Sequence, residues 1–325
     1  MNNNITLHFA CLSRFPRLCA LAVMHLLVLI PLVLPADTFG PYTYTITDGQ
    51  ATITSFDRAY SGTLSITNKL GGYPVTSIGD DAFRDCSSLI VVTIPVGVTS
   101  IGFSAFSWCE SLVFVTIPDS VTNIGELAFN TCTSLTSIAV SENNPRYASI
   151  DGVLFDKTLT TLIQYPSGLS GSYTIPTGVT NIGDRAFSRC TSLAAVTLPD
   201  SVIGIGDEAF SDCATLVAVT IATGVTDIGF AAFSFCPSLT SVTIPGSVTN
   251  ICGTAFSGCS QLVHVYFSGA APDVGDDFLF YNAPNVTVYR LPGKAGWPTV
   301  PEPWQGRPTA LWNGPPVPGR REGND

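Results

Sequence analysis

The residues of this chain best suited to chemistry are seven cysteines that recur at one position of a repeated pattern. Each cysteine follows a phenylalanine by three residues, and each of these phenylalanines follows an alanine. The seven are Cys86, Cys109, Cys132, Cys190, Cys213, Cys236 and Cys259. Such a set could be packed as buried thiols, oxidised to disulfides or bound to zinc. Which of these applies depends on how the fold places the copies.

Two further kinds of residue could do acid–base chemistry. An acid precedes the alanine–phenylalanine pair in several copies, as at Asp80, Glu126, Asp184 and Asp207. We expect these carboxylates to cap short helices rather than to form a catalytic pair. His264 is the single histidine after residue 36, and we expect it on the surface. No motif sets a nucleophile beside a base, so the sequence predicts no enzyme, no cofactor and no metal.

The cysteines belong to a repeat whose copies predict one structural unit. Its phenylalanines are spaced by 23 residues within two sets, Phe83, Phe106 and Phe129, then Phe187, Phe210, Phe233 and Phe256. A leucine follows each cysteine by three residues and opens the segment L-x-x-V-x-I, which alternates like a strand. Pro95 ends one such strand, V-T-x-I forms a second extended piece, and Gly102 permits a turn. Copies that cannot bury their apolar face alone stack into a solenoid.

Stacking decides between the possible states of the cysteines. Identical positions line up, so the phenylalanines form one column and the cysteines another. Cβ vectors in such a column run parallel, which is poor geometry for a disulfide, and a line of thiols is not the tetrahedron that zinc requires. We therefore predict buried thiols, and keep one or more disulfides and a metal site as the alternatives. Cys252 replaces the glycine of V-T-x-I-G, which we interpret as sequence drift.

Composition favours a fold rich in strands and turns. Of the 325 residues, 46% are hydrophobic and 12% are charged, and there are 29 glycines and 23 prolines. A chain of this kind is β-rich rather than a helix bundle. The formal net charge of -10 at pH 7 argues against nucleic acid as a partner, because nucleic acids bind basic surfaces.

The full pattern L-x-x-V-x-I-P…V-T-x-I-G-x-x-A-F-x-x-C resembles the BspA-like class of leucine-rich repeats, found in bacterial surface and secreted proteins and in some protists. The resemblance extends from Val75 to Phe267. It implies a β-rich α/β solenoid: a right-handed leucine-rich repeat array with a parallel sheet on one face and short helical turns and extended segments on the other. It also implies an adhesin or a protein-binding surface protein, without naming a ligand.

The middle of the chain departs from the period, since Val121 and Val179 are 58 residues apart instead of 23. The extra stretch, residues 141–178, resembles the longer repeat variant of the same family. We expect it to contain a hairpin from Val153 to Ile163 that turns at Asp156-Lys157.

The ends of the chain predict other segments. Arg14 and Arg17 precede an apolar run, and Ala36 offers a cleavage site, so residues 1–36 are expected to be a signal peptide, with an uncleaved anchor as the alternative. Residues 37–74 are expected to form a hairpin cap around Asp48-Gly49 and a degenerate first repeat. Repeats then occupy residues 75–268, a C-terminal cap residues 269–312, and a disordered tail residues 313–325. The mature protein would be secreted or held at the cell surface, with no membrane span after cleavage.

A candidate binding surface lies on the side of the predicted sheet that faces away from the core. Its outward residues include Thr93, Phe114, Thr116, Thr197, Thr220, Thr243, His264 and Tyr266. Threonine favours strands in any case, but an uncharged strip with aromatic residues near both ends suits a protein or glycan ligand. We therefore expect a monomeric, non-catalytic binding scaffold. A structural spacer or coat component, or a surface that orders water or ice, are the alternatives.

Overall fold

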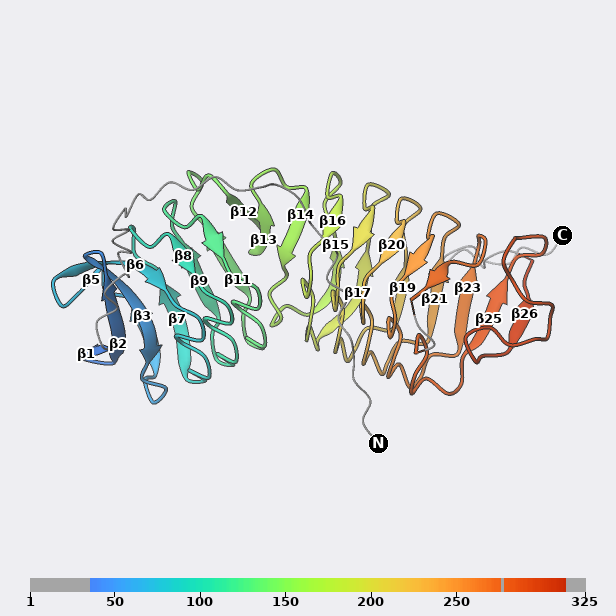
Figure 1. Cartoon of the computed structure of the whole chain (residues 1–325), viewed down its shortest axis with the longest axis horizontal. Helices are drawn as coiled ribbons and strands as arrows, with labels where there is room; N and C mark the ends of the chain where they lie inside the picture. The colour runs from blue at the N-terminus through green and yellow to red at the C-terminus, as the bar shows by residue number, and fades with distance from the viewer. Residues whose placement is uncertain (1–35, 276–277, 314–325) are drawn as a thin grey trace, which may run out of the picture. The chain divides into compact units, whose positions relative to one another are not determined.

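The computed structural model describes residues 36–275 and 278–313, which form a row of stacked rungs from β1 to β26 (Figure 1). The expected signal peptide, residues 1–36, and the expected tail, residues 313–325, lie outside the described residues, apart from Ala36 and Asn313 themselves. Each regular rung contributes two strands, and equal positions of successive rungs pair in parallel. The 23-residue period therefore sets the register of the ladders between regular rungs.

The L-x-x-V-x-I segments form two parallel sheets, which we call the outer sheets. The first has the order β11-β9-β7-β4, and the second has the order β15-β17-β19-β21-β23-β25-β26. The first consists of β4 (Gly62–Ser65), β7 (Leu89–Thr93), β9 (Phe114–Ile117) and β11 (Ser137–Val140). The second consists of β15 (Gly171–Thr174), β17 (Leu193–Thr197), β19 (Ala218–Thr220), β21 (Ser241–Ile244), β23 (His264–Phe267), β25 (Thr287–Arg290) and β26 (Thr309–Leu311).

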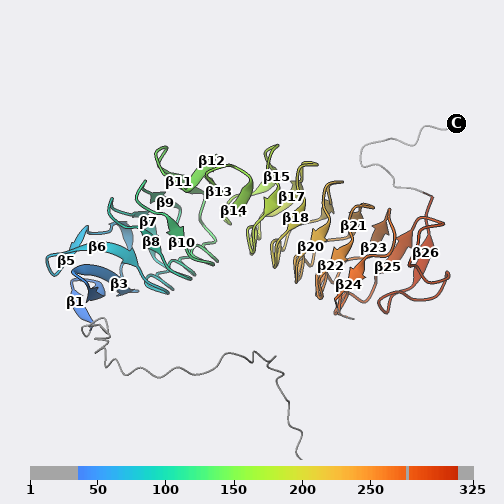
Figure 2. The same ribbon diagram turned by 45° about the horizontal axis from the view of Figure 1, so that its top comes forward.

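The V-T-x-I segments also pair, so the array has sheets on a second face as well as on the expected one. We call these the second sheets, and Figure 2 shows both rows of strands. One contains β1 (Asp37–Phe39), β2 (Tyr42–Thr47), β3 (Gln50–Phe56), β5 (Lys69–Leu70), β6 (Tyr73–Ile78), β8 (Ser100–Ile101) and β10 (Asn123–Ile124). The other contains β12 (Tyr147–Ile150), β13 (Val153–Asp156), β14 (Thr161–Gln164), β16 (Asn181–Ile182), β18 (Gly204–Ile205), β20 (Asp227–Ile228), β22 (Asn250–Ile251) and β24 (Asp273–Val274).

The expected short helices at A-F-x-x-C are wrong, because residues 36–275 and 278–313 contain no helix. These segments are successive turns that stack into what we call the turn ladder. Alternate N–H groups bond within the rung, as from Ala82 to the Gly79 oxygen at 3.3 Å, and to the next rung, as from Phe83 to the Ala105 oxygen at 2.7 Å. The residue directly before the alanine is left-handed, with φ of 54° at Asp81. A helix would need every N–H for its own rung.

The recurring acids have a different role from the helix caps expected of them. The Asp80 carboxylate accepts a hydrogen bond from the Phe103 N–H at 2.7 Å, across to the next rung. Asp184 accepts from the Asp207 N–H at 2.8 Å, and Asp207 from the Phe230 N–H at 2.7 Å. These acids therefore join neighbouring rungs of the turn ladder.

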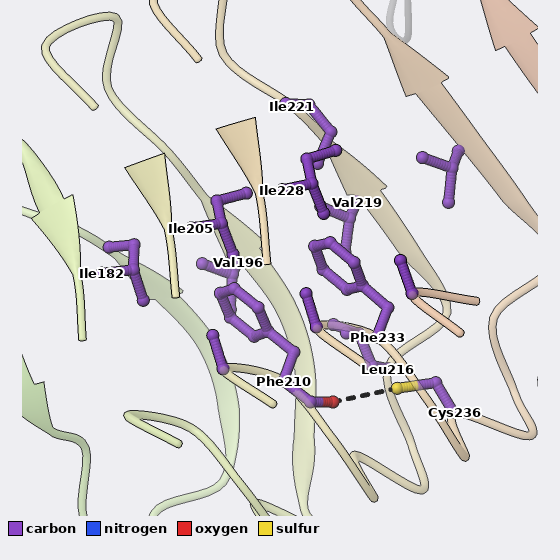
Figure 3. Packing of buried hydrophobic residues seen from close by; sticks show 14 of the residues in the cluster. Ile182, Val196, Ile205, Phe210, Leu216, Val219, Ile221, Ile228, Phe233 and Cys236 are labelled. Atoms are coloured by element: carbon purple, nitrogen blue, oxygen red, sulfur yellow. Dashed lines mark hydrogen bonds between the residues drawn. The ribbon is translucent and has the colours of Figure 1, made fainter. Parts of the chain in front are cut away.

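The core between the sheets holds the predicted columns. Phe210 stacks on Phe187 and Phe233 with ring centroids 4.7 and 5.1 Å apart. All seven column cysteines are buried and free, which confirms the prediction of buried thiols. Their thiols also bond between rungs: the Cys236 thiol donates to the Phe210 carbonyl at 3.1 Å (Figure 3), and Cys109, Cys132, Cys213 and Cys259 make the equivalent contact. Some of the phenylalanine carbonyls also accept a hydrogen bond from the backbone N–H of the cysteine in the same rung. The Phe83 carbonyl, for example, accepts from the Cys86 N–H at 3.2 Å.

The long repeat interrupts the array. The expected hairpin is present as β13 and β14, which pair antiparallel, and β12 adds a third strand beside β13. The side chain of Asn144, fully buried, donates to the carbonyls of Pro118 and Val121 and accepts from the N–H groups of Arg146 and Tyr147. Both the outer and the second sheets break here, and the buried residues fall into two clusters, one on each side of the break.

Both ends of the array are covered. A hairpin of β2 and β3, which turns at Asp48-Gly49, pairs with β6 at the N-terminal end. At the C-terminal end, Trp297 and Trp304 pack against the buried Phe267 with ring centroids 5.0 and 5.3 Å away. The ends of the core are thereby shielded from water.

A candidate binding surface on the outer sheets

The outward threonines of the outer sheets lie in register, because each rung repeats the same strand. In the first outer sheet Thr93 is paired with Thr116, and Thr116 with Ala139. In the second, Thr197, Thr220 and Thr243 are paired in succession and continue to Tyr266 and Tyr289; the residues that alternate with them, such as Val219, point into the core. The expected rows of outward residues are therefore present.

The rows do not form one strip along the array. Thr93, Phe114 and Thr116 belong to the first outer sheet, whereas Thr197, Thr220, Thr243, His264 and Tyr266 belong to the second. The expectation of a single surface with Phe114 near one end and Tyr266 at the other is wrong, because the long repeat separates the two sheets. Two surfaces must be considered instead of one.

Both surfaces lack charge. In the strands of the outer sheets the only residue with a formal charge is Arg290, and its side chain points inward, 9% exposed. Its guanidinium donates to the Pro298 carbonyl at 2.8 Å. The acids that give the chain its negative charge lie outside these strands, as Asp80 and Asp184 do on the turn ladder. A ligand of the outer sheets would therefore meet hydroxyls and rings rather than ions.

Aromatic residues gather at the C-terminal end of the second outer sheet. The rings of His264, Tyr266, Tyr289 and Trp312 form what we call the aromatic cluster. Tyr266 is stacked on Tyr289 and packs against Trp312, with both centroid distances 4.9 Å, while His264 meets the edge of Tyr289 at 5.5 Å. All four side chains are partly exposed. Burial against these neighbours, helped by the nearby Tyr289 phenol, raises the pKa of Tyr266 above its usual 10.0.

Sequence reasoning found half of this cluster. The sequence prediction places Tyr289 and Trp312 in the C-terminal cap, although Tyr289 follows Tyr266 by 23 residues, the period of the array. That spacing could have identified it as one more outward residue. Trp312 in turn follows Tyr289 by 23 residues, although the structure pairs Tyr289 with Ala310 of β26 rather than with Trp312.

The first outer sheet is the weaker candidate for a binding surface. Phe114 is half-buried, and Thr116 holds its hydroxyl buried without a hydrogen-bond partner among the described residues. The most exposed phenylalanines that the structure describes in the repeats are instead on the turn ladder, at Phe103 (44%), Phe230 (48%) and Phe235 (56%). The second outer sheet is therefore the better candidate surface of the two.

The residues considered for chemistry do not meet in a reactive site. Burial raises the pKa of Cys86 to about 11 and that of Cys132 to about 12, and it also raises the pKa of Cys190, so these thiols stay protonated at neutral pH. His264 lies among tyrosines on the outer face. No group of three or more metal-liganding side chains occurs among the residues that the structure describes. That part of the chain also contains no helix long and apolar enough to cross a bilayer.

Comparison with known proteins identifies the class of protein. Residues 56–171 and 169–287 match the BspA type leucine-rich repeat region, so the chain belongs to that family. It is similar to a leucine-rich repeat protein from Eubacterium ventriosum, at 23% identity over 80% of this chain and 85% of that chain, with a TM-score of 0.57. The pneumococcal vaccine antigen PcpA is 19% identical over 80% and 94%, with a TM-score of 0.51.

A third solved structure, a leucine-rich cell surface protein from Faecalibacterium prausnitzii, is 26% identical over 80% of this chain and 96% of that chain, with a TM-score of 0.48. A search of curated proteins finds no match. The family rests on the match of the leucine-rich repeat region, and the solenoid fold is shared with the Eubacterium ventriosum protein and with PcpA.

Proposed function

We propose that this protein is a secreted or cell-surface scaffold that binds a protein or glycan ligand without catalysis, through the outer face of the second outer sheet. The observation that carries the proposal is the aromatic cluster. Aromatic side chains contribute a large share of the binding energy at interfaces, and three of the four rings in this cluster lie on the strands β23 and β25, whose outward residues carry no formal charge. Membership of a leucine-rich repeat family is consistent with a binding role.

Secretion is proposed on the sequence alone. Arg14 and Arg17, the apolar run and Ala36 are typical of a signal peptide. Mass spectrometry of the protein recovered from the medium or the cell surface should find an N-terminus at Asp37. An intact N-terminus would instead support an anchored protein. Light scattering of the mature protein should give the mass of a monomer.

The binding proposal is tested with an array of immobilised polysaccharides and extracellular proteins. For any probe that binds saturably, Tyr266→Ala and Tyr289→Ala should each weaken binding about fivefold or more, which corresponds to about 1 kcal/mol. Thr220→Lys should block binding by placing a charge in the contact. Phe235→Ala removes an equally large ring from the turn ladder and serves as the control.

The Phe235→Ala control also shows which results would contradict the binding proposal. A probe whose affinity ignores the three outer-sheet variants but falls with Phe235→Ala would place the site on the turn ladder. No saturable binding to any probe would favour the spacer or coat alternative. The threonine row from Thr197 to Thr243 would order ice if the protein depressed the freezing point without lowering the melting point, and that measurement tests the remaining alternative.

A further inference from the structure

The turn ladder is interrupted at the long repeat, and the interruption leaves backbone groups without partners. In a regular rung the turn donates to the next rung, as the Ser104 and Phe106 N–H groups do to the Glu126 and Ala128 carbonyls at 3.0 and 2.8 Å. The equivalent donors of the following rung are the N–H groups of Leu127 and Phe129. Neither has a hydrogen-bond partner within residues 36–275 and 278–313.

The cause is a turn that is too short. Leu162 of β14 is paired with Ile182 of β16, so the two residues occupy equal positions in their rungs. Tyr165 then takes the place of the column phenylalanine, stacked on Phe187 at 4.9 Å. Three residues separate the first pair of positions in the long repeat (165 − 162), and five separate them in the regular rung (187 − 182). The long repeat therefore lacks two residues of the turn.

A cavity of about 210 Å³ occupies the resulting space, which we call the turn slot. One wall is Gly125, Glu126 and Leu127, and the opposite wall is Gly183, Asp184 and Arg185. Leu154 and Ile163 also line it. The slot is larger than the ~150 Å³ cavity known to admit benzene. Ile124 at its edge is only half-buried, whereas the equivalent Ile101 and Ile182 are buried.

Polar groups from both walls are available to a ligand. Besides the Leu127 N–H, the N–H and the carbonyl of Asp184 have no partner in the part of the chain that the structure describes. In the next rung, the Asp207 N–H donates a hydrogen bond to the Asp184 carboxylate. A carboxylate in the turn slot would bond the Asp184 N–H in the same way. The Arg185 guanidinium is already paired with Glu208 at 2.7 Å, and it lies 3.7 Å from Glu126 across the slot.

We propose that the turn slot binds a turn of a partner polypeptide that begins with glycine followed by an acidic residue. The repeat itself shows what fits between two such walls. The first residue must be glycine, because a Cβ at Gly206 would lie 2.7 Å from the Asp184 backbone nitrogen, and one at Gly125 would lie 2.6 Å from Gly102. The acid supplies the carboxylate for Asp184, and the peptide carbonyl accepts from Leu127. This site lies on the turn ladder and is independent of the outer sheets.

The probe is a capped peptide with the sequence of residues 206–209, Gly-Asp-Glu-Ala. Titrated into the folded protein, it should bind saturably in the millimolar range or tighter. It should slow hydrogen exchange of the Leu127 and Asp184 amides about tenfold, while the Phe106 amide, already bonded within the ladder, should not change. The same peptide with Gly206→Val should bind at least tenfold more weakly, because the added side chain meets the wall.

A filled slot provides the matched protein variant. Ile163→Trp should reduce peptide binding at least tenfold, while Ile203→Trp, at an exposed position 51% accessible in a regular rung, should leave it unchanged. Circular dichroism shows whether each variant is folded. If Ile163→Trp does not fold, the exchange data on the unmodified protein decide. The proposal is wrong if no saturable binding occurs, if protection appears only at the array ends, or if folded Ile163→Trp binds the peptide normally.

Discussion

Truncation of Phe210 tests whether the phenylalanine column carries the stability of the array. The side chain is fully buried and lies between the rings of Phe187 and Phe233, at 4.7 and 5.1 Å. Phe210→Ala loses about 1.5–3 kcal/mol of burial free energy. It also leaves a cavity of roughly 100 Å³, which costs ~2 kcal/mol at about 24 cal/mol per Å³. We expect the free energy of unfolding to fall by about 4 kcal/mol.

Urea unfolding followed by circular dichroism measures this change, with Phe235→Ala as the control. Phe235 has the same side chain on the turn ladder but is 56% exposed, so its truncation should change stability by less than about 1 kcal/mol. Hydrogen exchange then locates the damage. Because buried residues on the two sides of the long repeat form separate clusters, amides of β17 and β19 should exchange faster in Phe210→Ala, while those of β7 and β9 should not.

The reasoning would be refuted if Phe210→Ala cost no more than Phe235→Ala at an unchanged denaturant slope. Such a result would mean that the stacked rungs relax to fill the space, and that backbone ladders rather than ring stacking hold the array. Uniform acceleration of exchange from β7 to β25 would refute the second part, because it would show that the two clusters unfold as one unit.

Three further predictions follow from buried polar groups and thiols. Asn144→Ala should destabilise the protein by about 3 kcal/mol or more in urea unfolding, because it leaves two carbonyls and two N–H groups buried without their partner; a loss below about 1 kcal/mol would contradict this. Thiol titration of the unreduced, denatured mature protein should find close to eight free thiols, and Cys213→Ser should cost about 1–3 kcal/mol; two or fewer thiols would overturn the buried-thiol assignment. Since burial raises the pKa of Cys86 from 9.0 to about 11, its contribution to stability should be complete below pH 9 and be lost between pH 9 and 11; the urea midpoint should therefore fall less steeply over that range in Cys86→Ala than in the unmodified protein.

The sequence predicted the parts of the fold that depend on spacing. A constant interval of 23 residues places Phe187, Phe210 and Phe233 above one another whatever the conformation between them, so the column could be predicted without knowing how the turns are built. The same holds for the cysteine column. Hairpin turns at Asp48-Gly49 and near Asp156-Lys157 could also be predicted, because their signals are local.

The conformation of the turns could not be predicted from the same information. A capping acid three residues before a phenylalanine suggests a helix start when one copy is considered alone. In the array, the Asp80 carboxylate and the Phe83 N–H both bond to the next copy, and those bonds replace the helical ones. The local preference for a helix does not decide the conformation here, because the neighbouring rung offers the N–H groups hydrogen-bond partners that an isolated copy lacks.

The candidate surfaces divide in the same way. Outward residues such as Thr220 and Tyr266 can be predicted from strand alternation and the period. The outward position of Tyr289 could have been predicted in the same way. The turn slot depends on something that the sequence does not contain, namely two residues missing between Leu162 and Tyr165. That absence becomes visible only once the register of β14 against β16 shows which residues occupy equal positions. In a repeat protein, surfaces formed by the regular period can therefore be predicted from the sequence. A site formed by a defect in the period can be identified only from the register of the stacked rungs.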